Sequence, residues 1–534
     1  MRSQSRLLIL LSGMLSITLC QAANITGTVK GVDGGPFQGA FVEAQNSKTK
    51  ITTIVLSDTK GRYHIDDLPA GEYRLQIRAV GFQVDPKTGI NLTANQKLSQ
   101  DFSLQKGMVH WNDLSLSQAR QFWPESKTKE LIIQNCNDCH LFQTRIASAS
   151  RDVEGWRDRV EYMLQSEHYG LSHITSKDAD DIAAYLAKLF GPDSVLPKSP
   201  EEMPGYKDAI RPFSSEALDI VYVEYDMPGP NRMPFSAAPD KDGFFWVPYY
   251  GPANKIGRLD PNTGVVTEFP VPNQGTAAIH SAVPARDGTV WLAETAANKL
   301  GQWDPKTQTI TEYQAAYLPG KEGIRAGGTK HTVRFDSAGN VWASGYPLTK
   351  FDPETKKYTR FDEVPSSYDI SLDRAENVWF TSPQNNKIGK LDAKTMKITQ
   401  WEMPTKGSFP RRLTIAPDGM IWIGEFNGGK IASFDPKTEA IKEYPLPGAH
   451  PTPYALGFDN DGYLWYDSHH MDLLGRLDIK TGKVVEYPFP HSEIAMREFF
   501  KDSKGRIWYG TNPNNKVGYF YLANKGPRGK GAAK

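Results

Sequence analysis

Residues 216–522 repeat one pattern of apolar and polar positions. Each repeat passes from a polar turn into an apolar strand with a tryptophan, then into a phrase such as Asn254–Asp260, and closes with a strand such as Thr267–Pro270. Successive tryptophans lie 45, 51, 37, 43, 43 and 43 residues apart, at Trp246, Trp291, Trp342, Trp379, Trp422, Trp465 and Trp508. Repeats of about 43 residues with four strands each are typical of β-propellers. The pattern therefore predicts a seven-bladed β-propeller whose second and third blades are irregular.

The two ends of the repeat region predict how the ring closes. The last repeat stops after Asn515–Phe520 without its closing strand. The missing strand stands at the front, because Tyr222–Pro228 matches Ile441–Pro447 and Val484–Pro490. We expect this N-terminal strand to complete the C-terminal blade, which removes an exposed sheet edge.

Residues 24–106 show a different pattern. Apolar and polar residues alternate in Ile25–Val29 and in Tyr73–Ile77, between turns rich in Gly, Asp and Pro. Strict alternation over short runs predicts β-strands, so we expect an all-β domain here.

Residues 107–200 change to helical periodicity. It is clearest in Val153–Gln165 and in Lys177–Phe190, and Lys127–Asn135 predicts a further helix. The stretch 192–206 is rich in Pro, Ser and Gly, and we interpret it as a linker to the propeller. The fold class is therefore multidomain and mainly β, with one small α-helical domain.

The two chain termini add targeting information. Residues 1–22 combine a basic start with an apolar run from Leu7 to Leu19, which indicates a secretory signal peptide. Cys20 raises lipidation as an alternative, but Leu19 stands where a lipoprotein signal has a small residue. We expect a periplasmic or secreted protein. No later apolar run is long enough to cross a membrane, and residues 523–534 form a basic tail.

Composition narrows the function classes. The net charge is +1, so the overall balance favours neither nucleic-acid nor membrane-surface binding. After signal cleavage only Cys136 and Cys139 remain among three cysteines, so no structural disulfide is expected and both thiols are available for another task.

These cysteines belong to the motif Cys136-Asn137-Asp138-Cys139-His140, which is the attachment signature of c-type haem. Two cysteines at this spacing each bond one vinyl group, and the adjacent His140 reaches the iron from the same turn. We expect one covalent haem c, although a chance match or a CxxC redox pair remains an alternative. The sequence therefore predicts a cytochrome c domain over residues 107–200.

The sixth iron ligand is less determined. Met163 follows the motif on the predicted helix 153–165, and His168 and His173 are alternatives. The layout resembles the compact cytochrome c domains of quinohaemoprotein dehydrogenases, and that resemblance implies Met163. The alternative is a purely structural role, in which Met163 only packs on one face of its helix.

Aligning the repeats on tryptophan gives two columns of polar residues. Eleven residues before each tryptophan stand Phe235, His280, His331, Tyr368, Arg411, Tyr454 and Arg497. Three residues after it stand Tyr249, Glu294, Gly345, Ser382, Glu425, Ser468 and Thr511. Innermost propeller strands line a central channel, so we expect the first column to form a ring there. The neighbouring columns are interpreted as mostly small or apolar core.

Such a ring predicts a ligand site or, as an alternative, polar residues that border channel water. His280 and His331 are candidate bases and Glu294 a candidate catalytic carboxylate. Arg411 and Arg497 would bind an anionic or phenolic ligand. Tyr249, Tyr368, Glu425 and Tyr454 complete the predicted ligand channel, and a divalent metal at His280, Glu294 and His331 is conceivable. Of His469 and His470, at most one is expected to face inward.

Two family resemblances rest on repeated phrases. The runs Ser57–Tyr63, Leu68–Tyr73 and Gly81-Phe82 resemble the carboxypeptidase regulatory-like domain, which implies a transthyretin-like sandwich with a structural or interaction role. The phrases Asn298–Gly301 and Pro417–Trp422 resemble the virginiamycin B (streptogramin) lyase family.

The lyase resemblance implies a propeller and a site with a His base and metal-binding glutamates. His280 and Glu294 have that spacing, but the second glutamate falls at Ala278 and the additional histidine at Phe235. With His331 as base, the glutamate positions become Thr329 and Gly345. Neither register is complete, so streptogramin lyase activity is not expected.

The favoured hypothesis is an exported oxidoreductase in which the channel binds a small molecule and the haem relays electrons to or from a redox partner. The first alternative is a non-catalytic electron-transfer or binding module that docks a partner protein or a glycan. The second is a streptogramin lyase-like carbon–oxygen lyase with an accessory haem.

Overall fold

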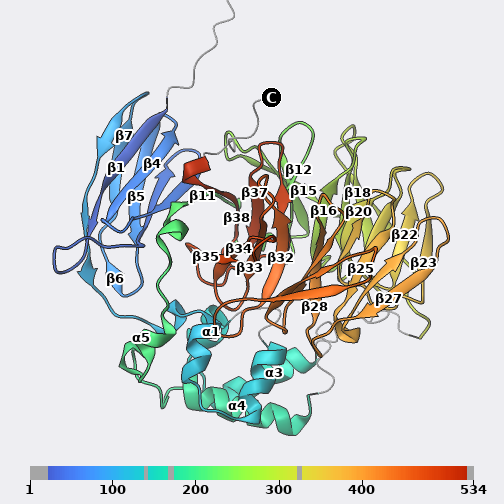
Figure 1. Cartoon of the computed structure of the whole chain (residues 1–534), viewed down its shortest axis with the longest axis horizontal. Helices are drawn as coiled ribbons and strands as arrows, with labels where there is room; N and C mark the ends of the chain where they lie inside the picture. The colour runs from blue at the N-terminus through green and yellow to red at the C-terminus, as the bar shows by residue number, and fades with distance from the viewer. Residues whose placement is uncertain (1–21, 137–141, 166–173, 321–327, 526–534) are drawn as a thin grey trace, which may run out of the picture.

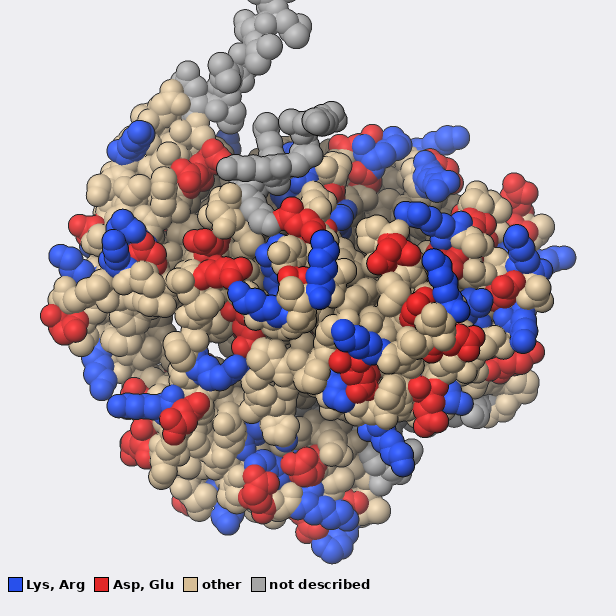
Figure 2. Space-filling view, viewed as in Figure 1, with Lys and Arg blue, Asp and Glu red and all other residues tan. Residues whose placement is uncertain are grey.

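The computed structural model describes residues 22–136, 142–165, 174–320 and 328–525. An N-terminal domain of strands and a small helical domain both lie against a propeller-like set of sheets (Figure 1). Lys, Arg, Asp and Glu side chains are interspersed on the face shown in Figure 2, in keeping with the small net charge. None of the helices in the described part of the chain has the length and apolar content needed to cross a bilayer.

The N-terminal domain is a sandwich of two sheets. Its strands are β1 (Ala23–Lys30), β2 (Phe41–Asn46), β3 (Thr52–Leu56), β4 (Arg62–Leu68), β5 (Gly71–Arg78), β6 (Phe82–Gln83), β7 (Lys87–Leu92), β8 (Lys97–Ser99), β9 (Phe102–Ser103) and β10 (Gln105–Lys106). One sheet has the order β4-β1-β8, and the other contains β3-β2-β5-β7. Alternating residues such as Ile25, Val42, Ile65 and Leu75 are fully buried between them. The predicted all-β domain is confirmed.

The helical domain packs around one apolar cluster that includes Trp111, Trp123, Phe142 and Leu186. Its α-helices are α1 (Leu116–Ala119), α2 (Lys127–Leu131), α3 (Val153–Gln165), α4 (Ser176–Phe190) and α5 (Tyr206–Ala209). Its 3₁₀ turns are η1 (Trp111–Asp113), η2 (Arg120–Phe122) and η6 (Pro200–Glu202), and its π-helical turns are η3 (Ile132–Cys136) and η4 (Gln143–Ala147). The helix start at α4 is fixed by Thr175, whose side chain accepts the N–H of Asp178.

The stretch predicted as a linker belongs to this helical domain instead. The indole N–H of Trp111 donates to the carbonyl of Pro197 at 2.8 Å. Leu196, Met203 and Tyr206 pack against the same apolar cluster. Composition indicated a flexible connection, but these three apolar side chains gain enough burial to hold it in place.

The C-terminal region consists of four-stranded antiparallel sheets. Six of them, among the described residues, are formed by β12 (Ala238–Pro239), β13 (Phe245–Pro248), β14 (Lys255–Leu259) and β15 (Val266–Pro270); β16 (Ile279–Pro284), β17 (Val290–Glu294), β18 (Lys299–Trp303) and β19 (Ile310–Gln314); β20 (Thr329–Phe335), β21 (Val341–Tyr346), β22 (Leu348–Asp352) and β23 (Lys357–Phe361); β24 (Ile370–Leu372), β25 (Val378–Ser382), β26 (Lys387–Leu391) and β27 (Ile398–Glu402); β28 (Pro410–Ile415), β29 (Ile421–Glu425), β30 (Lys430–Phe434) and β31 (Ile441–Pro445); and β32 (Pro453–Phe458), β33 (Leu464–Ser468), β34 (Leu473–Leu477) and β35 (Val484–Pro488). The 3₁₀ turn η7 (Ser215–Asp219) leads from the helical domain into the first propeller strand, η9 (Pro383–Asn385) joins β25 to β26, and η10 (Ala523–Lys525) ends the described chain.

A further set of strands joins the two ends of the repeat region. It has the order β36 (Phe500–Lys501), β37 (Ile507–Thr511), β38 (Lys516–Leu522) and β11 (Ile220–Asp226). β11 runs antiparallel to β38, from the pair Ile220 and Leu522 to the pair Asp226 and Lys516. The predicted pairing of the N-terminal strand with the last repeat is confirmed.

This sheet does not stop at β11. β3 of the N-terminal domain pairs with the outer side of β11, so that Ile54 lies opposite Tyr222. The result is one eight-stranded sheet in the order β36-β37-β38-β11-β3-β2-β5-β7. An outer strand that would otherwise expose its N–H and C=O groups is therefore covered by the neighbouring domain.

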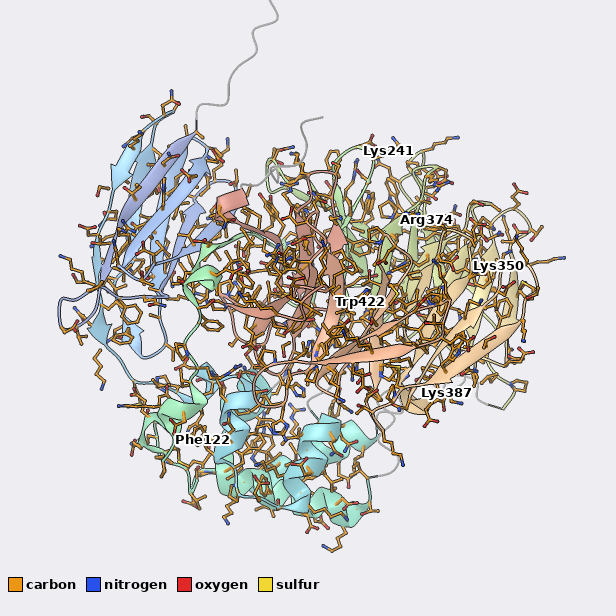
Figure 3. The ribbon with its side chains drawn as sticks, viewed as in Figure 1. Phe122, Lys241, Lys350, Arg374, Lys387 and Trp422 are labelled. Carbon is orange, nitrogen blue, oxygen red and sulfur yellow. The ribbon has the colours of Figure 1, made fainter. Side chains whose placement is uncertain are left out.

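Each repeated tryptophan lies on the second strand of its sheet, and five of the seven make the same hydrogen bond. The indole N–H donates to an aspartate six residues earlier, at 2.9–3.1 Å, in the pairs Trp246–Asp240, Trp342–Asp336, Trp379–Asp373, Trp465–Asp459 and Trp508–Asp502. The same aspartate also accepts backbone N–H groups of the turn, as Asp502 does from Lys504 and Arg506. Trp422, labelled in Figure 3, has Ala416 at this position, and its buried Nε1 has no acceptor among the described residues.

This difference predicts two changes of opposite sign. Asp502→Ala removes the acceptor for four N–H groups, including the Nε–H of Arg506, and should lower the free energy of unfolding of that sheet by about 2 kcal/mol. Ala416→Asp supplies the missing acceptor for Trp422 and should raise it by about 1 kcal/mol. Chemical denaturation followed by tryptophan fluorescence measures both. In a Trp422→Phe background Ala416→Asp should give a smaller gain, and an equal gain would contradict the assigned hydrogen bond.

Candidate functional site: the propeller channel and the helical domain

The residues eleven positions before each tryptophan come together in a closed ring. Ring centroids lie 4.9 Å apart for Phe235 and His280, 3.5 Å for His280 and His331, and 4.2 Å for His331 and Tyr368. The hydroxyls of Tyr368 and Tyr454 contact each other. The guanidiniums of Arg411 and Arg497 both lie 5.0 Å from the ring centre of Tyr454, and that of Arg497 lies 5.3 Å from Phe235. Except for half-buried Tyr368, all are at most 5 % exposed.

Backbone irregularities direct these side chains toward the channel. The innermost strands β16, β20, β28 and β32 each contain a register shift at the ring residue, as between Pro410 and Leu413 around Arg411. In four repeats the residue two positions before the ring residue is non-glycine with positive φ: Met233, Ala278, Phe409 and Ala495. Bulges and left-handed residues of this kind re-aim side chains and are common beside functional sites.

A second polar layer follows immediately, and sequence analysis missed it. Nη1 of Arg412 donates at 2.9 Å to Asp369 and at 2.9 Å to the hydroxyl of Thr332. Nη2 of Arg334 donates to Glu498 at 2.6 Å. The column predicted as small or apolar therefore carries buried charges. A register shift lets two neighbouring residues leave the strand's regular alternation, and the doublet Arg411-Arg412 was the sequence signal for it.

This second layer contains buried polar atoms without partners. Nε and Nη2 of Arg412, Oε2 of Glu498 and Oγ of Ser236 have none among the described residues. Arg412 is only 2 % exposed. Unpartnered buried polar groups are costly unless water or a ligand satisfies them. The channel below the ring therefore has the character of a polar binding site.

A buried lysine lies beside the ring. Lys330 precedes His331, is fully buried, and donates from Nζ at 3.1 Å to Asn298 and to the carbonyl of Thr329. Burial, with a smaller contribution from Arg360, lowers its pKa to about 7. Such an amine is neutral for part of the time near pH 7 and can accept a proton.

The polar residues predicted three positions after each tryptophan do not lie in the channel with the ring. A Cβ on Gly301 of β18 would lie 2.7 Å from Oε1 of Glu294, and Glu294 interacts with Glu312 on the outer strand β19. Glu425 has the same relation to Glu443 on β31, and the Tyr249 hydroxyl lies over Gly257 of β14. These three side chains point outward within their sheets. The expectation that they share the channel with His280 does not agree with this arrangement, because they stand on the second strand and face the third.

The conceivable metal site is not assembled either. Among the described residues no group of three or more His, Cys, Asp or Glu side chains is arranged to hold a metal ion. The physical reason is the orientation of Glu294, whose carboxylate lies over Gly301 and away from His280 and His331.

The two outward carboxyls have unusual acidities. Burial raises the pKa of Glu294 from 4.5 to about 8, and the nearby Glu312 raises it further. Burial, with Glu443 as the second cause, raises the pKa of Glu425 to about 8. Near pH 7 both carboxyls are therefore mostly protonated.

His469 and His470, of which at most one was expected to face inward, are both buried. The ring of His469 stacks on Tyr454 at 5.0 Å, and its Nδ1 lies 3.1 Å from Oδ2 of Asp467. Burial lowers the pKa of His469 well below its usual value and raises that of Asp467 to about 8. The ring and the β33–β34 turn are therefore in direct contact.

The helical domain docks on the same end of the channel as the ring. Ser117 donates from its backbone N–H to the carbonyl of His470 at 2.8 Å and from its hydroxyl to that of His450 at 3.3 Å. His450 lies in the loop that leads to Tyr454, at the second position of β32. Figure 1 shows the helices beneath this end of the propeller.

The segment that follows the cysteine motif makes the closest contacts. Nε2 of Gln143 donates to Asp472 at 2.5 Å. Thr144 donates to the two oxygens of Glu493, from its N–H at 2.9 Å and from its hydroxyl at 2.7 Å. Glu493 is 2 % exposed and stands four residues before Arg497 of the ring. A buried carboxylate that accepts two hydrogen bonds fixes this segment firmly at the channel end.

The predicted haem ligands are only partly within the described residues. Cys136 ends the π-helical turn η3 and packs against the apolar cluster of the helical domain. Met163 is half-buried on α3. Cys139, His140, His168 and His173 lie outside the described residues. The indole nitrogens of Trp123 and Trp156 are buried and have no acceptor among the described residues. These N–H donors fit the carboxylates of a haem, and the apolar cluster of the domain fits its ring.

The raised carboxyl pKa values predict how stability depends on pH. A carboxyl whose pKa is higher in the folded state stabilises the fold fully below its unfolded pKa, and this contribution is lost as pH rises through the folded value. For Glu294 and Glu425 that window runs from about pH 4.5 to about pH 8. The midpoint temperature of thermal unfolding should therefore decrease as the pH is raised from about 5 to about 9. The decrease should be smaller in the double variant Glu294→Gln/Glu425→Gln. Exposed Glu354→Gln is the control, and an unchanged pH dependence in the double variant would contradict the assignment.

Comparisons with known proteins agree with the two β regions. Residues 24–105 match the carboxypeptidase regulatory-like domain, and residues 348–525 match the virginiamycin B lyase family. No curated protein sequence matches the chain.

Two solved structures resemble the propeller part. A streptogramin B lyase is 24 % identical, with a TM-score of 0.51 over 58 % of this chain and 100 % of its own. A virginiamycin B lyase from Staphylococcus aureus is 24 % identical, with a TM-score of 0.51 over 57 % of this chain and 99 % of its own. At this identity the likeness shows the fold. The chain thus has an N-terminal β domain that matches the carboxypeptidase regulatory-like family model and a C-terminal propeller fold similar to that of the virginiamycin B lyases.

Proposed function

We propose that this chain is an exported haem c protein whose propeller channel binds a small anionic or phenolic molecule and whose haem exchanges electrons with it. The propeller in this proposal has seven blades, with β36-β37-β38-β11 as the seventh. The observation that carries the proposal is the docking of Gln143 and Thr144, three and four residues after the last residue of the CxxCH motif, on the loops beside the ring.

The channel residues have the chemistry for such a ligand. Arg411 and Arg497 both face Tyr454, where they would hold a carboxylate or phenolate oxygen. The imidazole centroids of His280 and His331 lie 3.5 Å apart in the same ring of side chains, and either would take the proton that a hydroxyl loses on oxidation. Haem c supplies one-electron chemistry when bound through Cys136 and Cys139 with His140 on the iron. Met163 is the proposed sixth ligand.

A second candidate function is electron transfer without catalysis in the channel. The observation that favours it is the filling of the ring by its own side chains, because Tyr368 contacts Tyr454 across the repeat that carries Arg411. In that case the N-terminal domain and the propeller would dock a redox partner protein or a glycan. Streptogramin elimination is not proposed, since Ala278 and Phe235 occupy two of the positions that the lyase site needs.

A substrate screen separates the two candidates. The oxidised protein is mixed with pools of alcohols, phenols and sugars, and haem reduction is followed by visible absorption. We expect one pool to reduce the haem, and His331→Gln to slow that reduction at least tenfold because a proton acceptor is lost. Arg286→Gln, an exposed change outside the ring, is the control. If no pool reduces the haem, or if His331→Gln reacts normally, the catalytic proposal fails and the electron-transfer module remains.

The docking contact makes a separate prediction. Thr144→Val removes the hydroxyl that donates to Glu493 and should loosen the motif segment from the channel end. Electron transfer from the bound molecule to haem should slow several-fold, while the concentration for half-saturation stays unchanged. Stopped-flow absorption measures both quantities. A change in half-saturation with an unchanged rate would show that Thr144 does not couple the two domains.

A further inference from the structure

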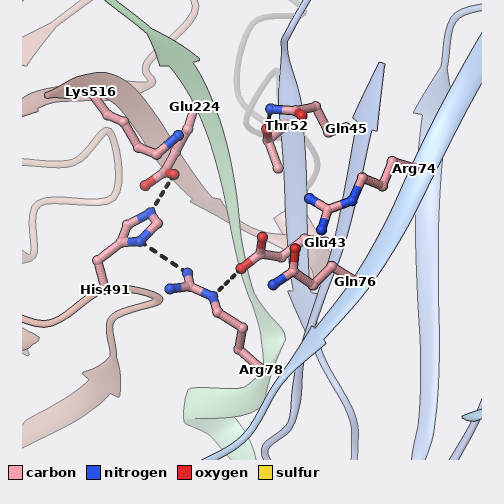
Figure 4. Close-up of a pocket in the computed structure, with 9 residues that line it drawn as sticks. All are labelled: Glu43, Gln45, Thr52, Arg74, Gln76, Arg78, Glu224, His491 and Lys516. Atoms are coloured by element: carbon pink, nitrogen blue, oxygen red, sulfur yellow. Dashed lines mark hydrogen bonds and ion pairs between the residues drawn. The ribbon is translucent and has the colours of Figure 1, made fainter. Parts of the chain in front are cut away.

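A pocket of about 210 Å³ lies between the N-terminal domain and the propeller. Strands β2, β3 and β5 line one side, and β11, β38 and the loop after β35 line the other. All the residues that line it are polar or charged: Glu43, Gln45, Thr52, Arg74, Gln76, Arg78, Glu224, His491 and Lys516 (Figure 4). Binding sites are frequent at domain interfaces of this kind.

Most charges in this pocket are already paired. Arg78 pairs with Glu43, and its Nη2 lies 3.0 Å from Nδ1 of His491. Nε2 of His491 lies 2.6 Å from Glu224. Lys516 pairs with Asp226. Of these contacts, the one between Arg78 and His491 crosses the junction of the two domains. The dashed lines in Figure 4 show it as the middle link of the chain Glu43–Arg78–His491–Glu224.

Two side chains in the pocket are not committed. The guanidinium of Arg74 and the amide of Gln76 make no hydrogen bond or ion pair with any residue that the structure describes. Both come from β5, and in Figure 4 both extend into the space between the two domains. A guanidinium with five donors in a planar fork matches the two oxygens of a carboxylate.

The fixed charges limit which anion fits. Glu43 and Glu224 lie on the wall of the same pocket, and Glu224 is only 1 % exposed. Glu43 is paired with Arg78 and Glu224 with His491, so among the lining residues Arg74 is the cation left for a ligand. One cation matches a singly charged anion better than a doubly charged one such as sulfate. The side chains of Gln45, Thr52 and Gln76 offer hydrogen-bonding groups around Arg74, and no apolar side chain lines the space. Such a lining favours hydroxyl groups on the ligand over a hydrocarbon chain.

We propose that this pocket binds a small hydroxylated monocarboxylate, with the carboxylate on Arg74 and the hydroxyls on Gln76, Gln45 and Thr52. The pocket volume corresponds to about seven water molecules, which is enough for a single sugar acid. All four partners lie on β2, β3 and β5 of the N-terminal domain, and β11 and β38 of the propeller form the opposite wall of the pocket. Haem and the propeller channel take no part in this binding.

The test uses the full chain and isothermal titration calorimetry at pH 7. The probe is D-glucuronate, D-glucose is its uncharged counterpart, and sulfate is the doubly charged anion. Arg74→Gln removes the proposed carboxylate partner at an exposed position that the fold does not need. Arg286→Gln, an exposed arginine of the propeller, is the matched control.

We expect D-glucuronate to bind to the wild type and to Arg286→Gln with equal affinity, and at least tenfold more weakly to Arg74→Gln. D-Glucose and sulfate should bind at least tenfold more weakly than D-glucuronate. The proposal is overturned if D-glucuronate does not bind, if Arg74→Gln binds it normally, or if D-glucose binds equally well. None of these outcomes depends on whether haem is attached, so they do not decide the proposed redox function.

Discussion

The antiparallel pairing of β11 with β38 is the constraint on which the rest of the structure depends. It brings residues 220–226 to residues 516–522, across almost the whole propeller sequence. The same strand receives β3 on its other side, so one strand joins both β domains through backbone hydrogen bonds. In the sequence, the helical domain lies between β3 and β11. Both of its ends are therefore held near the closure, and the domain comes to rest on one end of the channel.

Local backbone irregularity, more than strand periodicity, forms the channel. Regular strands alternate their side chains, and one face of each innermost strand would then meet the channel. The register shift at Pro410/Leu413 instead lets both Arg411 and Arg412 reach polar partners in the interior. This arrangement buries several charges, and the ion pair of Arg412 with Asp369 offsets only part of the desolvation cost. The buried charges of Arg411, Arg497, Asp369, Arg412 and Glu498 therefore have a reason beyond packing, and they support the proposal that the channel binds a ligand.

The repeat pattern was enough to predict the domain order, the closing strand and the residues of the ring, because those depend on period and hydrophobic alternation. It was not enough to place Glu294, because a fixed distance from tryptophan does not say toward which neighbouring strand a side chain turns. The acidity of Asp467 and the docking of Thr144 on Glu493 also escaped it. Both depend on contacts between residues far apart in sequence, and a single sequence contains no direct signal for them.

The central claim is that the segment from Cys136 to His140 carries a haem beside the channel. The most direct measurement is the intact mass of the protein exported by cells that contain the haem-attachment machinery. The account predicts one population heavier than the polypeptide by a single haem under denaturing conditions, and the loss of that mass in Cys136→Ser/Cys139→Ser. The mass of the bare polypeptide in the wild type, with folded protein recovered in normal amount, would contradict it.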